Sequence, residues 1–197
     1  VIAENSALDG GGVAIYDSHL AFDNNVVMDN QATRRGAGIY ASSGGQGFTT
    51  TVRLRHTTIA RNTGGGSGDG SGIHVDQNVY GDYVTVRLTN TLFAANAIGI
   101  TVTEGNTATL HATLWHANAT NWGGDGTLNH TGDVTGDPAF KPDGYHIDPT
   151  SAARNRGVDA GVTVDIDSQP RPATDGFDLG ADEYLPTVFM PMVLRGL

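Results

Sequence analysis

Apolar residues recur along this chain in short alternating runs and not at helical spacing. Five segments share one ending, in which a large apolar residue stands three positions before an asparagine; the asparagines are Asn5, Asn30, Asn62, Asn96 and Asn118. Successive asparagines are 25, 32, 34 and 22 residues apart, and the variation falls in glycine-rich stretches such as 43–47 and 64–72. A constant segment joined by loops of variable length is typical of a protein built from stacked repeats.

Each repeat predicts about three short strands separated by turns. Alternating apolar pairs precede the asparagines at equivalent positions: Leu20 and Phe22, Val52 and Leu54, Val86 and Leu88, Ala108 and Leu110. After the asparagine, a glycine precedes a second apolar pair such as Ile73 and Val75. A short unit of three strands without a helix cannot bury its apolar side alone. We therefore predict that each strand pairs in parallel with its counterpart in the next repeat, around one central core.

The five asparagines predict a ladder. Equivalent residues of stacked repeats lie about 4.8 Å apart, so that each side-chain amide can donate to the next and accept from the previous one. Asparagine also tolerates left-handed backbone, which suits a bend between strands. A lone asparagine in a turn would carry no such meaning. Five in register, each with an apolar residue at the same offset, favour the ladder.

The repeat resembles a known superfold. The turn that leads into Gly38-Ile39-Tyr40, and the strand from Thr57 to Asn62 with its Thr-x-Ile-x-x-Asn pattern, are similar to secreted bacterial repeats of the right-handed parallel β-helix family, the pectate-lyase-like superfold. The resemblance covers residues 1–121 and implies an all-β solenoid with a loop-rich C-terminal cap. It implies little about activity, because the same coil carries lyases, glycosidases, adhesins and passive stalks.

The segment 122–184 differs from the repeats and predicts a separate cap module. Its motifs, in order, are Gly136-Asp-Pro-Ala-Phe140, Tyr145-His-Ile147, Ser151-Ala-Ala-Arg-Asn155, Asp165-Ile-Asp167, Pro170-Arg-Pro172 and Asp178-Leu-Gly-Ala-Asp-Glu-Tyr184. This order is similar to the C-terminal module of bacterial choice-of-anchor β-helix proteins, with Ala152 in place of a proline and Ser168 in place of a glycine. The resemblance implies export and a secreted or cell-surface location. Residues 185–197 form an apolar tail, expected either to add a strand or to dock on another chain.

Composition narrows the possible functions. The formal net charge is −10 with a single lysine, Lys141, which makes a nucleic-acid partner improbable. Most of this charge belongs to residues 122–197, which hold 12 acids and 5 bases. Without cysteine there is no disulfide framework and no thiolate site. No apolar run approaches the roughly 20 residues of a membrane helix. The first residues lack both a methionine and a signal-peptide pattern, which predicts a processed piece of a longer chain.

Two columns of outward residues are candidate ligand-binding sites. Arg53 and Arg87 occupy the same position of adjacent repeats, and stacked guanidinium groups could bind a polyuronate. Tyr16, Tyr40, His74 and Thr101 each follow an aligned isoleucine, and rows of aromatic faces are a usual platform for sugar rings. In each column the alternative is structural: a solvated charged face, or aromatic neighbours that stabilise the sheet. No paired carboxylates suggest a catalytic acid and base.

Acidic clusters near the C-terminus suggest a metal site. Asp165 and Asp167, with Asp175 or Asp178, could supply oxygen ligands for calcium. The alternative is that they accept backbone hydrogen bonds in turns, with Asp165 or Asp178 paired to Arg171. The seven histidines show none of the short spacings of zinc motifs and predict polar positions in strands and turns.

Two classes of function follow. The first is a secreted or cell-surface structural and adhesive β-helix protein without catalysis, whose chains assemble head to tail through open strand edges and the apolar tail. The second is a carbohydrate-active enzyme or sugar-binding module acting on acidic extracellular polysaccharide. A third possibility is the distal end of a long adhesin with its binding residues upstream of residue 1. No cofactor is required by any of these, although calcium is compatible with the acidic clusters.

Overall fold

The computed structural model describes residues 1–45, 47–64, 72–76 and 82–186. These residues form strands β1 to β17 and no helix, so the described part of the chain contains no helical segment able to cross a membrane. The strands belong to three sheets. The chain is therefore all-β, as its composition predicts.

The strands of each sheet recur at regular intervals along the chain. Sheet A contains β1 (Ile2–Ala3), β4 (His19–Asp23), β5 (Val26–Met28), β8 (Thr50–Arg55), β9 (Thr58–Ala60), β12 (Val84–Ala94), β14 (Thr107–His116), β16 (Thr127–Thr131) and β17 (Val134–Thr135). Sheet B contains β2 (Ser6–Asp9), β6 (Gln31–Arg35) and β10 (Thr63–Gly64). Sheet C contains β3 (Val13–Tyr16), β7 (Ile39–Ser42), β11 (Ile73–Asp76), β13 (Ile98–Val102) and β15 (Thr120–Gly123).

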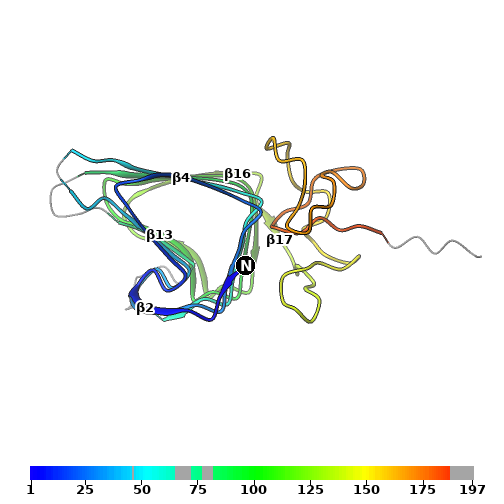
Figure 1. The fold of residues 1–197 in the computed structure, drawn as a ribbon, viewed down its shortest axis with the longest axis horizontal. Coiled ribbons are helices and arrows are strands. Elements are labelled where there is room, and N and C mark those ends of the chain that lie inside the picture. The colour runs from blue at the N-terminus through cyan, green and yellow to red at the C-terminus, as the bar shows by residue number, and fades with distance from the viewer. Residues whose placement is uncertain (46, 65–71, 77–81, 187–197) are drawn as a thin grey trace, which may run out of the picture.

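Every strand in the three sheets pairs in parallel with its equivalent one repeat away. In sheet A, for example, β12 lies between β8 and β14, with Leu88 opposite Leu54 and Leu110. In the first three repeats the chain visits sheets A, B and C in turn, and from β12 onward the described strands alternate between sheets A and C until β16. Figure 1 shows the result, because the successive passes of the chain superimpose almost completely in projection. The parallel pairing predicted from the repeat is confirmed.

Inward side chains of sheets A and C form one central core. The apolar residues that stand three positions before the ladder asparagines face each other in register, from Ile2 through Val27 and Ile59 to Phe93 and Trp115. The last two rings are stacked, with centroids 4.8 Å apart and an interplanar angle of 12°. Burying each such side chain contributes roughly 1.5–3 kcal/mol. The core is a column of like residues, and each repeat depends on its neighbours to complete it.

The asparagine ladder is confirmed. The Nδ2 group of each asparagine donates to Oδ1 of the next one along the stack, over distances of 3.0–3.2 Å for Asn5, Asn30, Asn62 and Asn96. The backbone N–H of each of these residues donates to the same oxygen. The Nδ2 groups of Asn30, Asn62 and Asn96 also donate to main-chain carbonyl oxygens of the preceding repeat. Each interior amide therefore satisfies buried backbone groups at the bend.

The left-handed residue at this bend is not the asparagine itself. It is the preceding residue, with φ between 50° and 60° at Glu4, Asp29, Arg61, Ala95 and Ala117. This placement leaves the asparagine side chain directed into the ladder. A second column of left-handed residues precedes this bend and divides sheet A into a first half, which contains β4 and β8, and a second half, which contains β5 and β9. Its members are Asn24, His56, Asn90, Ala112 and Gly132.

Glycine is required where sheet C begins. The residues before β7 and β11 are Gly38 and Gly72, and a Cβ atom added there would lie 2.4 Å and 2.3 Å from a backbone oxygen of the next repeat. At Gly38 the same atom would also lie 3.0 Å from the Asn62 amide nitrogen. The repeated glycine thus allows adjacent repeats to approach closely beside the ladder.

Parallel pairing continues beyond residue 121, where the sequence repeat fades. β15, β16 and β17 pair with β13 and β14, and the last paired residue is Thr135. Leu128 packs against the central core. The repeat is harder to recognise here because β16 and β17 are short and no further asparagine follows at the ladder position.

Residues 136–184, which we call the side module, lie beside the repeats and not across their end. Figure 1 shows this segment against the edge of the projection formed by the second half of sheet A. The outward residues of sheet A there are mostly apolar, and Leu92, Leu114 and Ala60 pack with Ile147 and Leu179 of the side module. The expected cap is therefore a lateral cover. The reason is that the second half of sheet A is apolar on both faces and needs covering on its outer face.

Hydrogen bonds fasten the side module to several repeats. Asn90 accepts from the Val158 N–H at 2.9 Å and donates to its carbonyl oxygen at 2.6 Å. Asn24 donates to the Val164 carbonyl oxygen, and Arg61 donates to that of Gly144. Of the predicted tail, only Leu185 and Pro186 are described, and residues 187–197 lie outside the described part of the chain.

The ladder predicts a position-dependent loss of stability. Replacement Asn62→Ala removes the acceptor of two Asn30 N–H groups and the donor to the Val27 carbonyl oxygen. Because buried groups without partners each cost about 1–3 kcal/mol, we expect the free energy of unfolding to fall by about 3 kcal/mol in urea titrations. Asn5→Ala, at the exposed end of the ladder, is the matched control and should cost less than about 1 kcal/mol. Equal losses at the two positions would contradict a cooperative ladder.

Candidate functional site

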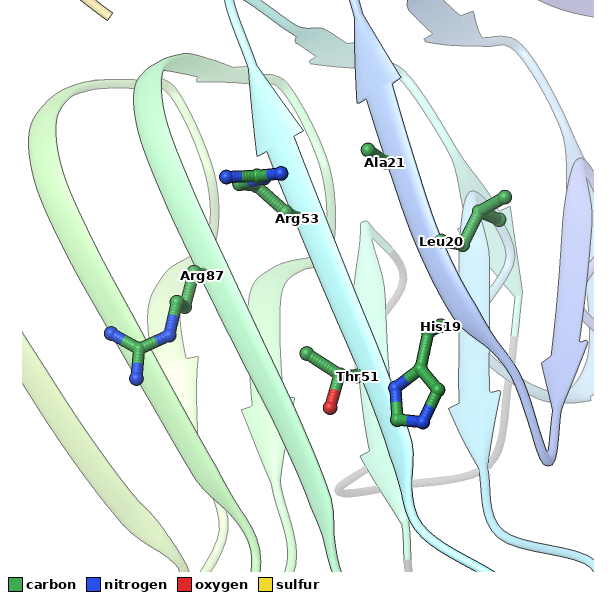
Figure 2. Close-up of a pocket in the computed structure, with 6 residues that line it drawn as sticks. All are labelled: His19, Leu20, Ala21, Thr51, Arg53 and Arg87. Atoms are coloured by element: carbon green, nitrogen blue, oxygen red, sulfur yellow. The ribbon is translucent and has the colours of Figure 1, made fainter.

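The arginine face is the outward surface of β4, β8 and β12 around Arg53 and Arg87. These two residues are directly opposite each other in the parallel pairing of β8 and β12, and both are exposed. Together with their neighbours they line a surface cavity of about 310 Å³, shown in Figure 2; the other lining residues are His19, Leu20, Ala21 and Thr51. The alignment of Arg53 with Arg87, predicted from the repeat, is confirmed.

Neither arginine of this face has a counter-ion among the described residues. The described residues give Arg53 and Arg87 no ion pair, whereas four other arginines of the repeats pair with aspartates of neighbouring repeats. Arg55, two residues beyond Arg53 on the same face, donates to both carboxylate oxygens of Asp23. Arg61 contacts Asp29 in the same way. Arg53 and Arg87 thus present two uncompensated positive charges on a chain whose net charge is −10.

Ion pairs between repeats account for the arginines of sheet B. Arg34 and Arg35 both contact Asp9, and Arg35 also contacts Asp76. The hydrogen bond from Arg34 is the main cause that lowers the pKa of Asp9 to about 2, against the opposing effect of burial. These arginines hold repeats together and are not free to bind a ligand.

A row of threonines borders the arginine face, and the sequence reasoning above missed it. Thr51, Thr85, Thr107 and Thr127 lie in register on successive strands of sheet A, two residues before Arg53, Arg87, Thr109 and Asn129 respectively. Their hydroxyl groups can both donate and accept hydrogen bonds. The signal was present as a threonine at a fixed position of every repeat after the first, where His19 occupies the equivalent place. No carboxylate lines the cavity among the described residues, so its walls offer cationic and neutral polar groups.

The aromatic column does not form an exposed platform. The register places Ala14, and not Tyr16, opposite Tyr40, so the expected alignment of Tyr16 was wrong by two residues. Tyr40 and His74 are in register and stacked at 5.8 Å, but each is only 3% exposed. The Arg35 guanidinium lies 4.8 Å from the centroid of the Tyr40 ring, and burial raises the pKa of Tyr40 to about 12. Tyr16 contacts the Tyr40 ring edge-on and is 46% exposed.

The register error has a physical cause. In the first repeat the apolar pair is Val13 and Ile15, whereas in the second repeat it begins at Ile39. The pairing aligns Val13 with Ile39 and Ile15 with Ala41. Because small and large apolar residues can both occupy inward positions, an alignment on isoleucine alone chose the wrong member of the pair.

The carboxylates proposed for calcium serve mainly as acceptors of backbone hydrogen bonds. Asp165 accepts from the N–H groups of Asp167, Gln169 and Glu183. Asp178 accepts from those of Asn155 and Tyr184, each at 2.7 Å. Asp167 belongs to a different group of possible metal ligands, with His146 and Asp182, among the described residues.

A buried ion pair organises the centre of the side module. Arg171 donates from Nη1 to Glu183 Oε2 at 2.7 Å and from Nη2 to the carbonyl oxygens of Gly180 and Ala181. Both side chains of the pair are fully buried. The sequence alternative that paired Arg171 with Asp165 or Asp178 is therefore wrong, because the ion pair forms with Glu183. Removing one member of such a pair is strongly destabilising because it leaves a buried charge uncompensated.

His56 lies between the repeats and the side module. It is fully buried, and its Nε2 atom lies 2.9 Å from the Asn90 amide nitrogen. Because an amide nitrogen can only donate, this contact fixes Nε2 as the acceptor. Burial, together with the positive charge of Arg171, lowers the pKa of His56 to about 3.

Comparisons with protein-family models, curated proteins and solved structures find no match to this chain. The functional interpretation therefore depends on the geometry of the chain itself.

The pKa of His56 predicts a pH-dependent stability. An unfolded histidine takes up a proton near pH 6.5, whereas folded His56 stays neutral until about pH 3. The unfolded state thus binds more protons between these values, and stability present above pH 6.5 is lost as the pH falls through this window. At pH 5 the loss from this residue is about 1–2 kcal/mol.

The variant His56→Asn tests this effect. Asparagine occupies the equivalent left-handed positions 24 and 90, so it fits the backbone while removing the titrating group. Thermal unfolding followed by circular dichroism at pH 7 and pH 5 should show a smaller drop in melting temperature for the variant than for the wild type. An identical drop in both proteins would show that His56 does not contribute.

Proposed function

We propose that this chain is a right-handed parallel β-helix protein of the cell surface or extracellular space, and that its arginine face binds an acidic polysaccharide. The β-helix is supported by parallel pairing of equivalent strands in three sheets and by the continuous ladder. The cell-surface location is supported by the ordered motifs of residues 136–184, which resemble anchor modules. Binding without cleavage is the adhesive form of this function.

One observation carries the binding proposal: Arg53 and Arg87 stand in register over an open cavity, and no described residue forms an ion pair with either of them. Their backbones are about 4.8 Å apart, so the two guanidinium groups can engage anionic groups on neighbouring units of one polymer. Guanidinium donates in a planar fork that matches a carboxylate. A polyuronate chain lying across the strands, along the stack of repeats, would also meet the hydroxyl groups of the threonine row.

Binding to polygalacturonate tests the arginine face. We expect Arg53→Gln and Arg87→Gln each to weaken binding about 3- to 10-fold in a titration at low salt, because each removes a charge-assisted hydrogen bond worth about 1 kcal/mol or more. Added salt should weaken wild-type binding, since the contact is exposed. Arg156→Gln is the matched control, because Arg156 is exposed and unpaired among the described residues but lies in the side module.

Incubation of the protein with the same polymer tests the alternative that it is an enzyme. Release of unsaturated products or reducing ends by the wild type, lost in Arg87→Gln, would replace the binding proposal by catalysis on acidic polysaccharide. Unchanged affinity in a variant that carries both Arg53→Gln and Arg87→Gln would show that the arginine face serves neither binding nor cleavage of the polymer.

A second candidate function is head-to-tail assembly. β1 to β4 at one end of the sheets, and β15 to β17 at the other, each have one side without a strand partner in the part of the chain that the structure describes. Because all strands are parallel, the last strands of one chain are complementary to the first strands of another. Leu8 on β2 is 59% exposed at this edge.

Charge at the edge tests the assembly. Lysine at an exposed strand edge disfavours pairing with another chain, so Leu8→Lys should shift sedimentation of the protein toward the monomer. Tyr83→Lys is the control, because Tyr83 is 56% exposed but lies between β11 and β12, away from the edge strands. A wild-type protein that stays monomeric at all concentrations would remove this candidate.

A further inference from the structure

A second cavity, of about 390 Å³, lies in the side module, far from the arginine face in sequence. His146, Asp167 and Asp182 line it, and each contributes one possible metal-ligand atom within 4.8 Å of the others. The three residues come from separate segments of the side module. Isolated antiparallel bridges, Phe140 to Ile147 and Val164 to Pro170, shape two of these segments.

The imidazole of His146 is oriented by a carboxylate outside this group. Its Nδ1 atom lies 2.7 Å from Oδ2 of Asp143, while its Nε2 atom lies 2.5 Å from Oδ2 of Asp167. Asp143 also accepts the backbone N–H groups of Tyr145 and His146, which fix its position. A histidine that donates from one ring nitrogen to a carboxylate presents the lone pair of the other nitrogen, as metal-binding histidines commonly do. At 2.5 Å a proton joins Nε2 to the Asp167 carboxylate, and a bound metal ion would replace that proton.

Asp182 supplies an independent indication of a cation. Its side chain is buried, with the residue only 4% exposed. The Ile147 N–H donates to its Oδ2 at 2.7 Å, and no described residue donates to its Oδ1. A carboxylate removed from water is stable only when it is paired, hydrogen-bonded or bound to a metal.

Gln169 adds an unpaired acceptor to the same cavity. Its Oε1 atom is buried and has no hydrogen-bond partner among the described residues, and the residue lines the cavity with Asp182. Buried acceptors without donors are rare in folded proteins. Gln169 Oε1 is therefore an acceptor that a positive ion, or water bound to it, would satisfy.

We propose that His146, Asp167 and Asp182 bind one divalent transition-metal ion of the zinc class, with Asp143 orienting the imidazole ring. Imidazole nitrogen and carboxylate oxygen together suit zinc, whereas calcium takes six to eight oxygen ligands. Bound metal would tie together three segments of the side module, and its binding free energy would add to the stability of the fold. This inference is independent of the proposed polysaccharide binding.

Sequence spacing could not reveal this group. His146 is 21 residues from Asp167 and 36 residues from Asp182, so no short ligand motif exists. The sequence predicted that the histidines are not zinc ligands. The proposed site replaces that prediction for His146.

Metal titration of the full chain tests the proposal. After dialysis against a chelator, we expect one Zn²⁺ per chain by isothermal titration calorimetry and a higher melting temperature with Zn²⁺ than without it. Co²⁺ should give visible absorption bands of a protein-bound ion, which report the ligand field directly. Excess Ca²⁺ in place of Zn²⁺ should leave the melting temperature unchanged.

Variants locate the ion. His146→Gln and Asp167→Asn should each weaken Zn²⁺ binding at least tenfold and remove the thermal shift. Asp167 is an exposed residue, so Asp167→Asn remains informative even if His146→Gln fails to fold, which far-UV circular dichroism would show. His130→Gln is the matched control, because His130 contacts Asp133 at 2.6 Å in the same way but has no third ligand.

Three results would overturn the proposal. The first is the absence of Zn²⁺ binding to the wild type. The second is undiminished binding in Asp167→Asn, which would place the ion elsewhere. The third is a thermal shift with Ca²⁺ but not with Zn²⁺, which would assign the cavity to calcium.

Discussion

The buried amide ladder determines how one repeat sits on the next. At its bend each repeat must satisfy backbone N–H and carbonyl groups that are out of reach of water, and one interior asparagine bonds both kinds of group. A shift of one residue would leave these groups unpaired and would turn Phe93 and its equivalents from the core to the outside. The ladder and the column of core residues that contains Phe93 thus impose the same register. Every other alignment in the molecule follows from it.

Once the register is fixed, each outward column acquires its own character. The first half of sheet A carries threonines and two unpaired arginines. Its second half carries apolar residues, which the side module covers. Sheet B presents Arg34 and Arg35, which pair with aspartates across repeats. A single parallel architecture therefore provides a polar surface, an apolar packing surface and a surface of ion pairs between repeats, according to which residue repeats at each position.

Features that repeat could be predicted from the sequence, and features that depend on single contacts could not. The strands, the ladder and the pairing of Arg53 with Arg87 each follow from a pattern seen several times. The alignment of Tyr16 failed because one repeat offers two apolar residues for one inward position. The lateral position of the side module and the approach of His146 to Asp182 arise from tertiary packing between segments without internal periodicity. Their motifs indicated a module but carried no information on which surface it covers.

The side module crosses several repeats, and this changes how the chain can come apart. Asn24, His56 and Asn90 belong to three successive repeats, and each contacts the module through a hydrogen bond or a ring contact. In a simple stack, each repeat interacts only with its neighbours, so the ends can fray while the middle persists. Because the side module contacts three repeats, it couples them beyond nearest neighbours. Unfolding of one repeat then requires the side module to dissociate from all three, which makes unfolding more nearly all-or-none than the repeated architecture alone would allow.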